Sequence, residues 1–316
     1  MNKWTKVGIS VGMGAAAVAT THVINKLIFS SAVADMVTDI NKKETYKWKF
    51  GNISYTVSGE GSPLLLIHDL RSTSSSYEWK NVIKAFSKYH TVYAIDLLGC
   101  GYSDKPNITY TTYMYTQLIN DFVINVINKK TDVIATGDAA PLTIMAAYNN
   151  PLIFSKIMLI NPQSIKKAMI NPGKKTNLRR YLLNSPIIGT LIYNICMSKN
   201  RINKYFTGNL FYNTKAVSPE LIKAYSENAH LYGSSAKFLY TSAVCHYTTA
   251  NIARAVKELN NCIYIIYGRD EKNINSIIKE YTELNSAIEL ASIQDTRHLP
   301  QLENPQKFFK TAKIFI

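Results

Sequence analysis

The sequence predicts an α/β protein in which a mostly parallel sheet is covered by helices on both faces. Two observations predict it. Short apolar runs such as residues 63–67, typical of strands buried on both faces, alternate with segments of helical periodicity. The chain of 316 residues, 47% of them hydrophobic, is also long enough for one large core that carries an inserted region.

Residues 1–34 are predicted to form an N-terminal apolar helix. No charged residue occurs in the 19 positions from Val7 to Asn25, about the length that crosses a bilayer. Three interpretations stay open: a single-pass membrane anchor, a helix lying on the membrane or on the domain, and an export signal ending at the small residues 32–34. We expect a membrane-associated protein with a single pass. Basic residues flank the segment on both sides, so charge does not assign the side of the membrane that holds the domain.

Residues 45–163 are predicted to form the first part of the sheet and its helices. Tyr46, Trp48 and Phe50 alternate with other residues before Gly51-Asn52, which is the pattern of a β-hairpin. The other elements expected here are strands at 63–67, 91–95, 133–135 and 155–160 and helices at 77–89, 113–128 and 142–149.

The alternation of strands and helices stops at residues 164–250. This stretch has the pattern of helices and loops, and we predict that it forms a cap over the carboxyl edge of the sheet. The alternation resumes in residues 251–316, with strands expected at 262–267 and 287–293 and helices at 273–284 and 303–315.

The formal net charge of +15 is distributed unevenly along the chain. No Asp or Glu occurs between Ala139 and Pro219, and this stretch could be an ordinary solvated surface or a face that docks on anionic lipid. No nucleic-acid recognition motif accompanies the charge, so nucleic acid is not an expected partner. The eleven basic residues of this stretch are Lys156, Lys166, Lys167, Lys174, Lys175, Arg179, Arg180, Lys199, Arg201, Lys204 and Lys215.

The four cysteines are scattered, with no C-x-x-C pair and no metal-ligand spacing with histidine. We therefore expect no metal site and no cofactor.

Residues 131–141 combine an apolar run, a cluster of small residues and a helical pattern. A strand, a sharp turn and a helix are the setting in which a G-x-S-x-G motif presents a nucleophilic serine. The five positions of that motif correspond to residues 135–139, and Gly137 occupies the central one. A glycine has no side-chain atom that can attack a carbonyl carbon.

Four further motifs follow one another in a fixed order. They are L-L-L-I-H at 64–68, D-L-L-G-C-G-Y-S-D-K-P at 96–106, Y-G-R-D-E at 267–271 and H-L-P-Q-L-E-N-P at 298–305. Together with the turn at Gly137, these motifs make residues 46–316 resemble the α/β-hydrolase superfamily, in the branch with a helical cap after the sixth strand. The resemblance implies an α/β-hydrolase fold with a mostly parallel eight-stranded sheet.

The resemblance also assigns roles to individual residues. His298 corresponds to the catalytic histidine, and Glu271, with Asp270 as the alternative, corresponds to the acid that orients it. The backbone N–H groups of Asp138 and Leu70 correspond to the oxyanion hole. One further departure accompanies the missing serine: Asp69 replaces the glycine of the family's His-Gly pair and brings a carboxylate near the oxyanion hole.

These residues predict a protein that keeps the fold, cap and pocket of a hydrolase but lacks serine-hydrolase activity. We expect it to bind a small apolar or acyl-type ligand under the cap, at a membrane. Two alternatives stay open: the pair of His298 and Glu271 activates water or deprotonates a substrate, or Asp138 acts as the nucleophile after a one-residue shift of the motif. An oxygen or sulfur of another side chain within reach of His298 would indicate an active enzyme.

Overall fold

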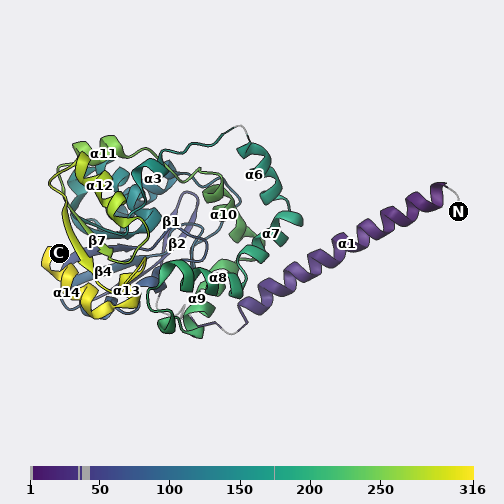
Figure 1. The fold of residues 1–316 in the computed structure, drawn as a ribbon, viewed down its shortest axis with the longest axis horizontal. Coiled ribbons are helices and arrows are strands. Elements are labelled where there is room, and N and C mark those ends of the chain that lie inside the picture. Colours follow the sequence, from purple (N-terminus) through teal and green to yellow (C-terminus); the bar gives the residue numbers. More distant parts are fainter. Residues whose placement is uncertain (1–2, 35, 38–42, 174) are drawn as a thin grey trace.

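A computed structural model describes residues 3–34, 36–37, 43–173 and 175–316 (Figure 1). Lys174, one of the basic residues counted above, lies outside the described residues. Eight strands form a single sheet in the order β1-β2-β4-β3-β5-β6-β7-β8. The hairpin of β1 and β2 joins β4 in antiparallel fashion and every other pairing is parallel, so the predicted mostly parallel eight-stranded sheet is confirmed.

The strands are β1 (Glu44–Trp48), β2 (Gly51–Ser58), β3 (Ser62–Ile67), β4 (His90–Ile95), β5 (Thr131–Thr136), β6 (Phe154–Ile160), β7 (Cys262–Gly268) and β8 (Glu289–Ile293). The helices of the core are α2 (Ile83–Phe86), α3 (Thr112–Phe122), α4 (Ala140–Asn149), α11 (Ala253–Glu258), α12 (Ile274–Leu284), α13 (Pro300–Glu303) and α14 (Pro305–Phe315). Between β6 and α11 the cap contains α5 (Ile165–Ala168), α6 (Thr176–Asn184), α7 (Ile188–Cys196), α8 (Lys199–Tyr205), α9 (Pro219–His230) and α10 (Lys237–Val244).

The central strands β3 and β5 bring two loops to the same edge of the sheet. Leu64 to Ile67 are completely buried, as expected for a strand covered on both faces. Ile67 pairs in register with Ala135 of β5, and the two strands run parallel. The loop that begins at His68 and the turn that begins at Gly137 therefore leave the sheet side by side.

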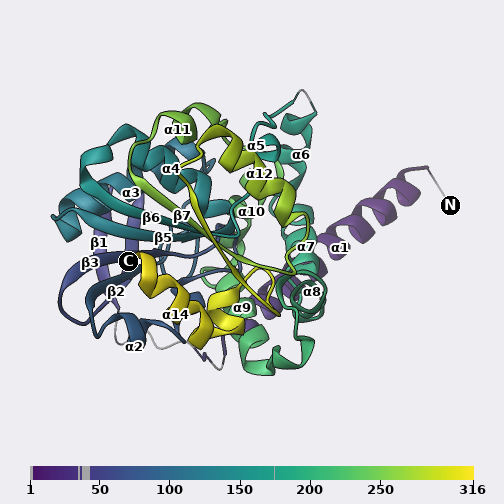
Figure 2. The same ribbon diagram turned by 60° about the vertical axis from the view of Figure 1, so that its left-hand side comes forward.

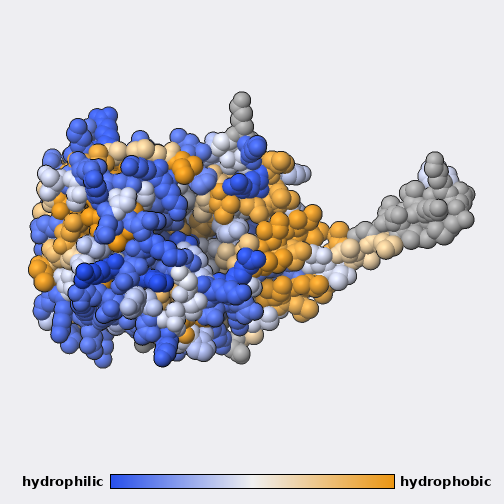
Figure 3. All heavy atoms as spheres, viewed as in Figure 1, coloured by the Kyte–Doolittle hydropathy of each residue, from blue (hydrophilic) through white to orange (hydrophobic). Residues whose placement is uncertain are grey.

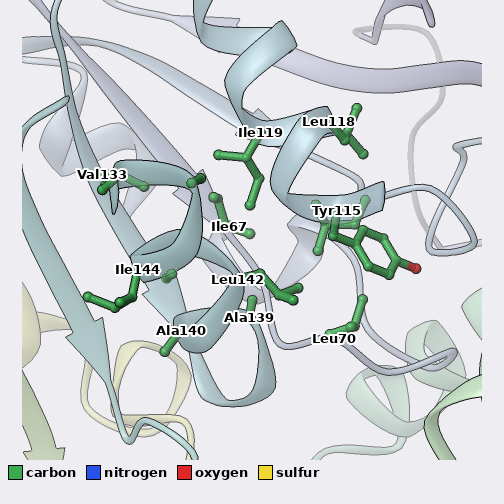
Figure 4. Packing of buried hydrophobic residues seen from close by; sticks show 14 of the residues in the cluster. Ile67, Leu70, Tyr115, Leu118, Ile119, Val133, Ala139, Ala140, Leu142 and Ile144 are labelled. Atoms are coloured by element: carbon green, nitrogen blue, oxygen red, sulfur yellow. The ribbon is translucent and has the colours of Figure 1, made fainter. Parts of the chain in front are cut away.

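Helices α3 and α4 pack together on one face of this part of the sheet (Figure 4). Leu142 and Ile144 of α4 and Leu118 and Ile119 of α3 are all buried in one apolar cluster that also contains Ile67. The cluster fixes the start of α4, and it thereby fixes the turn at Gly137 against the end of β5. On the opposite face, α14 covers the sheet (Figure 2).

One predicted helix differs from the observed structure. The helix predicted at 77–89 is instead a 3₁₀ helix, η1 (Ser76–Trp79), followed by the single turn α2. Polar contacts with the sheet edge hold this segment: the backbone N–H of Ser76 donates to Asp96, and Glu78 points into the core. The helix predicted at 303–315 is confirmed as α14, which begins at Pro305 because Asn304 caps it, and the single turn α13 precedes it.

The apolar segment at the N-terminus is helical, as α1 (Lys3–Ala32), and projects away from the body of the molecule (Figure 1). Its C-terminal turns contact α7 and α9 of the cap. Asn25 is buried there, where its side-chain oxygen accepts a hydrogen bond of 2.9 Å from Asn194 Nδ2. Among the described residues, α1 and every other helix fall short of the combined length and apolar character needed to cross a bilayer, so the predicted single pass is not supported.

Candidate active site

Gly137 lies at the sharp turn between β5 and α4, directly after the last residue of the strand. Its φ of +56° falls in the left-handed region that glycine adopts without steric cost. A Cβ atom at this position would lie 2.9 Å from Nε2 of His298. A side chain at position 137 would thus meet the imidazole, as the residue types of this turn predicted.

His298 comes from the loop after β8 and its imidazole is held by an acid from the turn after β7. Its Nδ1 lies 3.3 Å from Oε1 of Glu271. Asp270, the alternative acid, is exposed instead. Of the two neighbouring acids, Glu271 is the one that contacts the histidine.

Asn161 ties the histidine loop to the acid-bearing turn. This buried residue follows β6 and has a φ of +42°. Its amide nitrogen donates to the carbonyl oxygens of Arg297 and His298, at 2.8 and 2.9 Å, and its amide oxygen accepts from the N–H of Gly268 at 3.1 Å. Because three hydrogen bonds converge on one buried side chain, the ends of β6, β7 and β8 keep a fixed spacing.

The carboxylate of Asp69 occupies the centre of this arrangement. Oδ1 accepts a hydrogen bond of 2.8 Å from the backbone N–H of Asp138, the donor that the resemblance assigned to the oxyanion hole. Oδ2 accepts one of 2.6 Å from Nε of Arg71 and lies 3.3 Å from Nε2 of His298. An oxygen of another side chain therefore lies within reach of the imidazole, although no serine is present.

Asp69 and Gly137 depend on each other sterically. A Cβ atom added to Gly137 would lie 2.4 Å from Oδ1 and 2.7 Å from Cγ of Asp69. Carbon–oxygen contacts this short do not occur between nonbonded atoms, so any side chain at position 137 would displace the carboxylate. The Asp69 carboxylate fills the space in which a nucleophilic side chain of the turn would lie.

Asp69 is almost completely buried, and its charge is stabilised by its neighbours. Burial alone raises the pKa of its carboxyl group, but the positive charges of Arg71 and His298 and the N–H of Asp138 outweigh burial and hold that pKa far below its usual range. Conversely, burial lowers the pKa of His298, whereas its hydrogen bonds to Asp69 and Glu271 raise it to about 10. The two carboxylates therefore favour the imidazolium form of His298, and a protonated imidazole cannot act as a general base.

The backbone of Asp69 is held from both sides. The buried imidazole of His68 lies 2.7 Å from the carbonyl oxygen of Asp69 through Nδ1 and accepts from the N–H of Leu97 through Nε2. The N–H of Asp69 donates to Glu78 at 3.0 Å. Burial, with the nearby charge of Asp69, raises the pKa of Glu78 to about 7.

Asp138 and Leu70, the two residues that the resemblance assigned to the oxyanion hole, make different contacts. The backbone N–H of Asp138 points at Asp69, whereas its carboxylate oxygen accepts a hydrogen bond of 2.8 Å from Nε2 of Gln163. Burial and the negative charge of Asp69 raise the pKa of Asp138. Leu70 is buried and lines the larger cavity under the cap.

Two cavities lie between the cap and the sheet edge. The larger one has a volume of about 900 Å³ and is lined by Asp69 and by side chains of α7 to α10, but His298 is not among the residues that line it. His298, Glu271 and Gly137 line a smaller cavity of about 370 Å³. Asp69 therefore stands between the larger cavity and the histidine.

This fold and the order of these residues along the chain match a known family. The model of the alpha/beta hydrolase family matches residues 64–311. The chain belongs to this family. A soluble epoxide hydrolase of Corynebacterium sp. (strain C12) is 26% identical over 271 residues, which cover 83% of this chain and 92% of that protein.

Solved structures of the alpha/beta hydrolase family show the same fold. A serine hydrolase involved in carbazole degradation, the CarC enzyme, superposes with a TM-score of 0.71 at 14% identity and covers 86% of this chain and 97% of its own. The epoxide hydrolase CorEH superposes with a TM-score of 0.68 at 21% identity, over 86% of this chain and 97% of its own.

The sequence did not reveal the role of Asp69 or its pairing with Arg71. Asp69 was identified only as a departure that adds negative charge. The signal that could have found its role is the joint occurrence of two departures, a missing glycine after His68 and a missing side chain at Gly137. Arg71 carries no such signal, because one basic residue in a loop has many structural uses.

Proposed function

We propose that this member of the alpha/beta hydrolase family has no serine-hydrolase activity and binds a small apolar or acyl-type ligand in the larger cavity under the cap. The observation that carries the proposal is the position of the Asp69 carboxylate. Its two oxygens occupy the places that an attacking oxygen and a developing oxyanion would need. The Asp69 carboxylate occupies the reaction centre, whereas the larger cavity beside it is open.

The chemistry of the centre supports this proposal. An ester carbonyl gains stabilisation from an oxyanion hole only if the N–H groups of the hole are free to donate. The N–H of Asp138 already donates to a carboxylate that carries a full negative charge. A substrate carbonyl would have to displace the Asp69 carboxylate from its ion pair with Arg71, whose side chain is 35% exposed, and would leave the nearly buried carboxylate without this partner.

The lining of the larger cavity supports the class of ligand. Its cap side presents apolar side chains from the end of α7 through α10, and a volume of about 900 Å³ is that of a small-molecule site. Basic residues of the cap lie among them. The apolar lining residues of the cap are Met197, Ile202, Phe206, Leu210, Leu239, Ala243 and Val244.

Two measurements on the full chain test this function. We expect no covalent labelling of the wild type by a fluorophosphonate and no burst with an activated ester. We also expect saturable binding of a fluorescent fatty-acid analogue, weakened by Leu239→Trp, which fills the cavity, and unaffected by Leu152→Trp, on the exposed surface. Stoichiometric labelling of the wild type would rule the proposal out.

A second function is favoured by the distance of 3.3 Å between Oδ2 of Asp69 and Nε2 of His298. Here the carboxylate attacks an epoxide carbon, forming an ester bond while the carbon–oxygen bond of the epoxide breaks, and the imidazolium protonates the alkoxide. The neutral imidazole then takes a proton from water as the water attacks Cγ of Asp69, which releases a diol and restores the carboxylate. The similarity to the epoxide hydrolase of Corynebacterium supports the substrate class.

Isotope labelling separates the two functions. Under the second function, turnover of an epoxide in ¹⁸O-labelled water places ¹⁸O in the side chain of Asp69, and Asp69→Asn abolishes the turnover. Under the first function, neither the incorporation nor the turnover occurs. An enzyme that uses an Asp138 nucleophile would incorporate ¹⁸O at that residue, and one that uses only His298 and Glu271 would incorporate none and would lose turnover in His298→Ala.

A further inference from the structure

We infer that the face formed by α1, α6 and α7 docks the protein on the surface of a lipid bilayer that contains anionic lipids. The inference goes beyond the proposed function, because it concerns an outer face of the cap and not the cavity. In this arrangement α1, α6 and α7 lie at the interface, and none of them crosses the bilayer.

The outer side of α6 and α7 exposes large apolar side chains. Leu178 and Tyr181 of α6 are 75% and 81% exposed, and Ile188 and Ile195 of α7 are 57% and 50% exposed. In Figure 3 the region of α6 and α7 next to α1 forms a continuous hydrophobic area, whereas much of the body beside it is hydrophilic. An exposed apolar patch of this kind indicates a surface that binds a protein or a membrane.

Helix α1 extends the same face. Val23, Ile24 and Leu27 are exposed near the point where α1 meets the cap. Asn25 fixes that junction, because its side chain donates to the carbonyl oxygen of Ile187, at the start of α7, and accepts from Asn194. The exposed apolar residues of α1 are therefore held next to those of α7.

The positive charge around this face indicates an anionic partner. Arg179 of α6 and Lys175 before it are exposed, as are Lys26 of α1 and Lys199 after α7. Arg180 is half-buried, because it donates to Thr109. This part of the cap has no Asp or Glu. Apolar side chains beside a cluster of cations are the features of a helix that binds at the surface of an anionic membrane, where each cation strengthens binding about fivefold.

The same charge argues against a second copy of this chain as the occupant. In a twofold dimer the same face of each protomer meets its counterpart, so the exposed cations of this face would oppose one another. Like charges at such an interface repel unless acidic residues lie between them. The region 139–219 supplies no acidic residue for that purpose.

Vesicle flotation of the full chain tests the inference. The wild type is expected to float with vesicles of phosphatidylcholine mixed with phosphatidylglycerol, and less with phosphatidylcholine alone or at high salt. Leu178→Glu/Tyr181→Glu should lower the partition coefficient by at least about tenfold. The matched control Leu152→Glu/Ile314→Glu changes two residues that are 86% and 78% exposed elsewhere, and it should float like the wild type.

Tryptophan fluorescence gives a second readout on the same sample. Trp4 of α1 is 81% exposed, whereas Trp48 and Trp79 are buried. Brominated lipids should quench only the emission that is lost in Trp4→Phe. An absence of flotation, an equal loss in the control variant, or a dimer without vesicles that Leu178→Glu/Tyr181→Glu dissociates would overturn the inference.

Discussion

Restoring a serine at the turn should fail unless Asp69 is removed as well. In Gly137→Ser the new Cβ would lie 2.4 Å from Oδ1 of Asp69, about 1 Å inside the normal contact distance. The backbone φ of +56° adds about 1–2 kcal/mol for a residue that is not glycine. Either the serine distorts the turn or the carboxylate leaves Arg71. Overpacking of this kind costs about 1–3 kcal/mol.

We therefore expect Gly137→Ser to unfold at a temperature lower by about 5 °C or more and to remain unlabelled by fluorophosphonates. The double variant Asp69→Gly/Gly137→Ser removes the clash and frees the N–H of Asp138. It also removes one of the two acidic neighbours that raise the pKa of His298, so that the imidazole is no longer held as a cation by two carboxylates. Its labelling should be at least about 10²-fold faster than that of the single variant.

The assay combines thermal unfolding with the rate of fluorophosphonate labelling for the wild type, both single variants and the double variant. Asp69→Gly alone serves as the control for loss of the carboxylate, and it should remain unlabelled because no nucleophile is present. Equal labelling rates for Gly137→Ser and the double variant would refute the reasoning, since the carboxylate would then not occupy the serine's place.

Three further predictions concern pH, loop positioning and the core. Folding raises the pKa of His298 to about 10, so the protonated imidazole contributes fully to the free energy of unfolding below pH 6.5, and this contribution is lost as the pH rises to about 10. Urea unfolding should show this loss in the wild type and not in His298→Asn. Asn161→Ala should lower the free energy of unfolding by about 2–4 kcal/mol through three lost hydrogen bonds; an unchanged value would contradict the role of this residue. Leu142→Ala should cost about 2–5 kcal/mol and the exposed Leu152→Ala less than about 0.5 kcal/mol, measured by the same unfolding.

The fold could be predicted from the sequence because its strands carry strong local signals. The run at 63–67 is apolar without interruption, and the structure has β3 at Ser62–Ile67. The segment after it was mispredicted. Glu78 of η1 is buried, where it accepts hydrogen bonds from the N–H of Asp69, nine residues earlier, and from the hydroxyl of Tyr225, 147 residues later. Periodicity describes only local neighbours and cannot show such contacts.

The candidate site was predictable in part, for the same reason. His298 and Glu271 lie in recognisable motifs, and the parallel strands bring them together. The position of the Asp69 side chain depends on space that Gly137 vacates 68 residues later in the chain. Neither motif shows this exchange by itself. Only the joint occurrence of the two departures, at positions 69 and 137, indicates it, and the structure shows the contact that links them.

The mutual dependence of Asp69 and Gly137 couples a change at one position to a change at the other. Serine at position 137 alone would crowd the turn, and glycine at position 69 alone would leave the Arg71 guanidinium without its acid. Under the proposed function, neither single change supplies both a nucleophile and a free N–H group at Asp138. We therefore expect selection for ester hydrolysis to favour only chains in which both codons change.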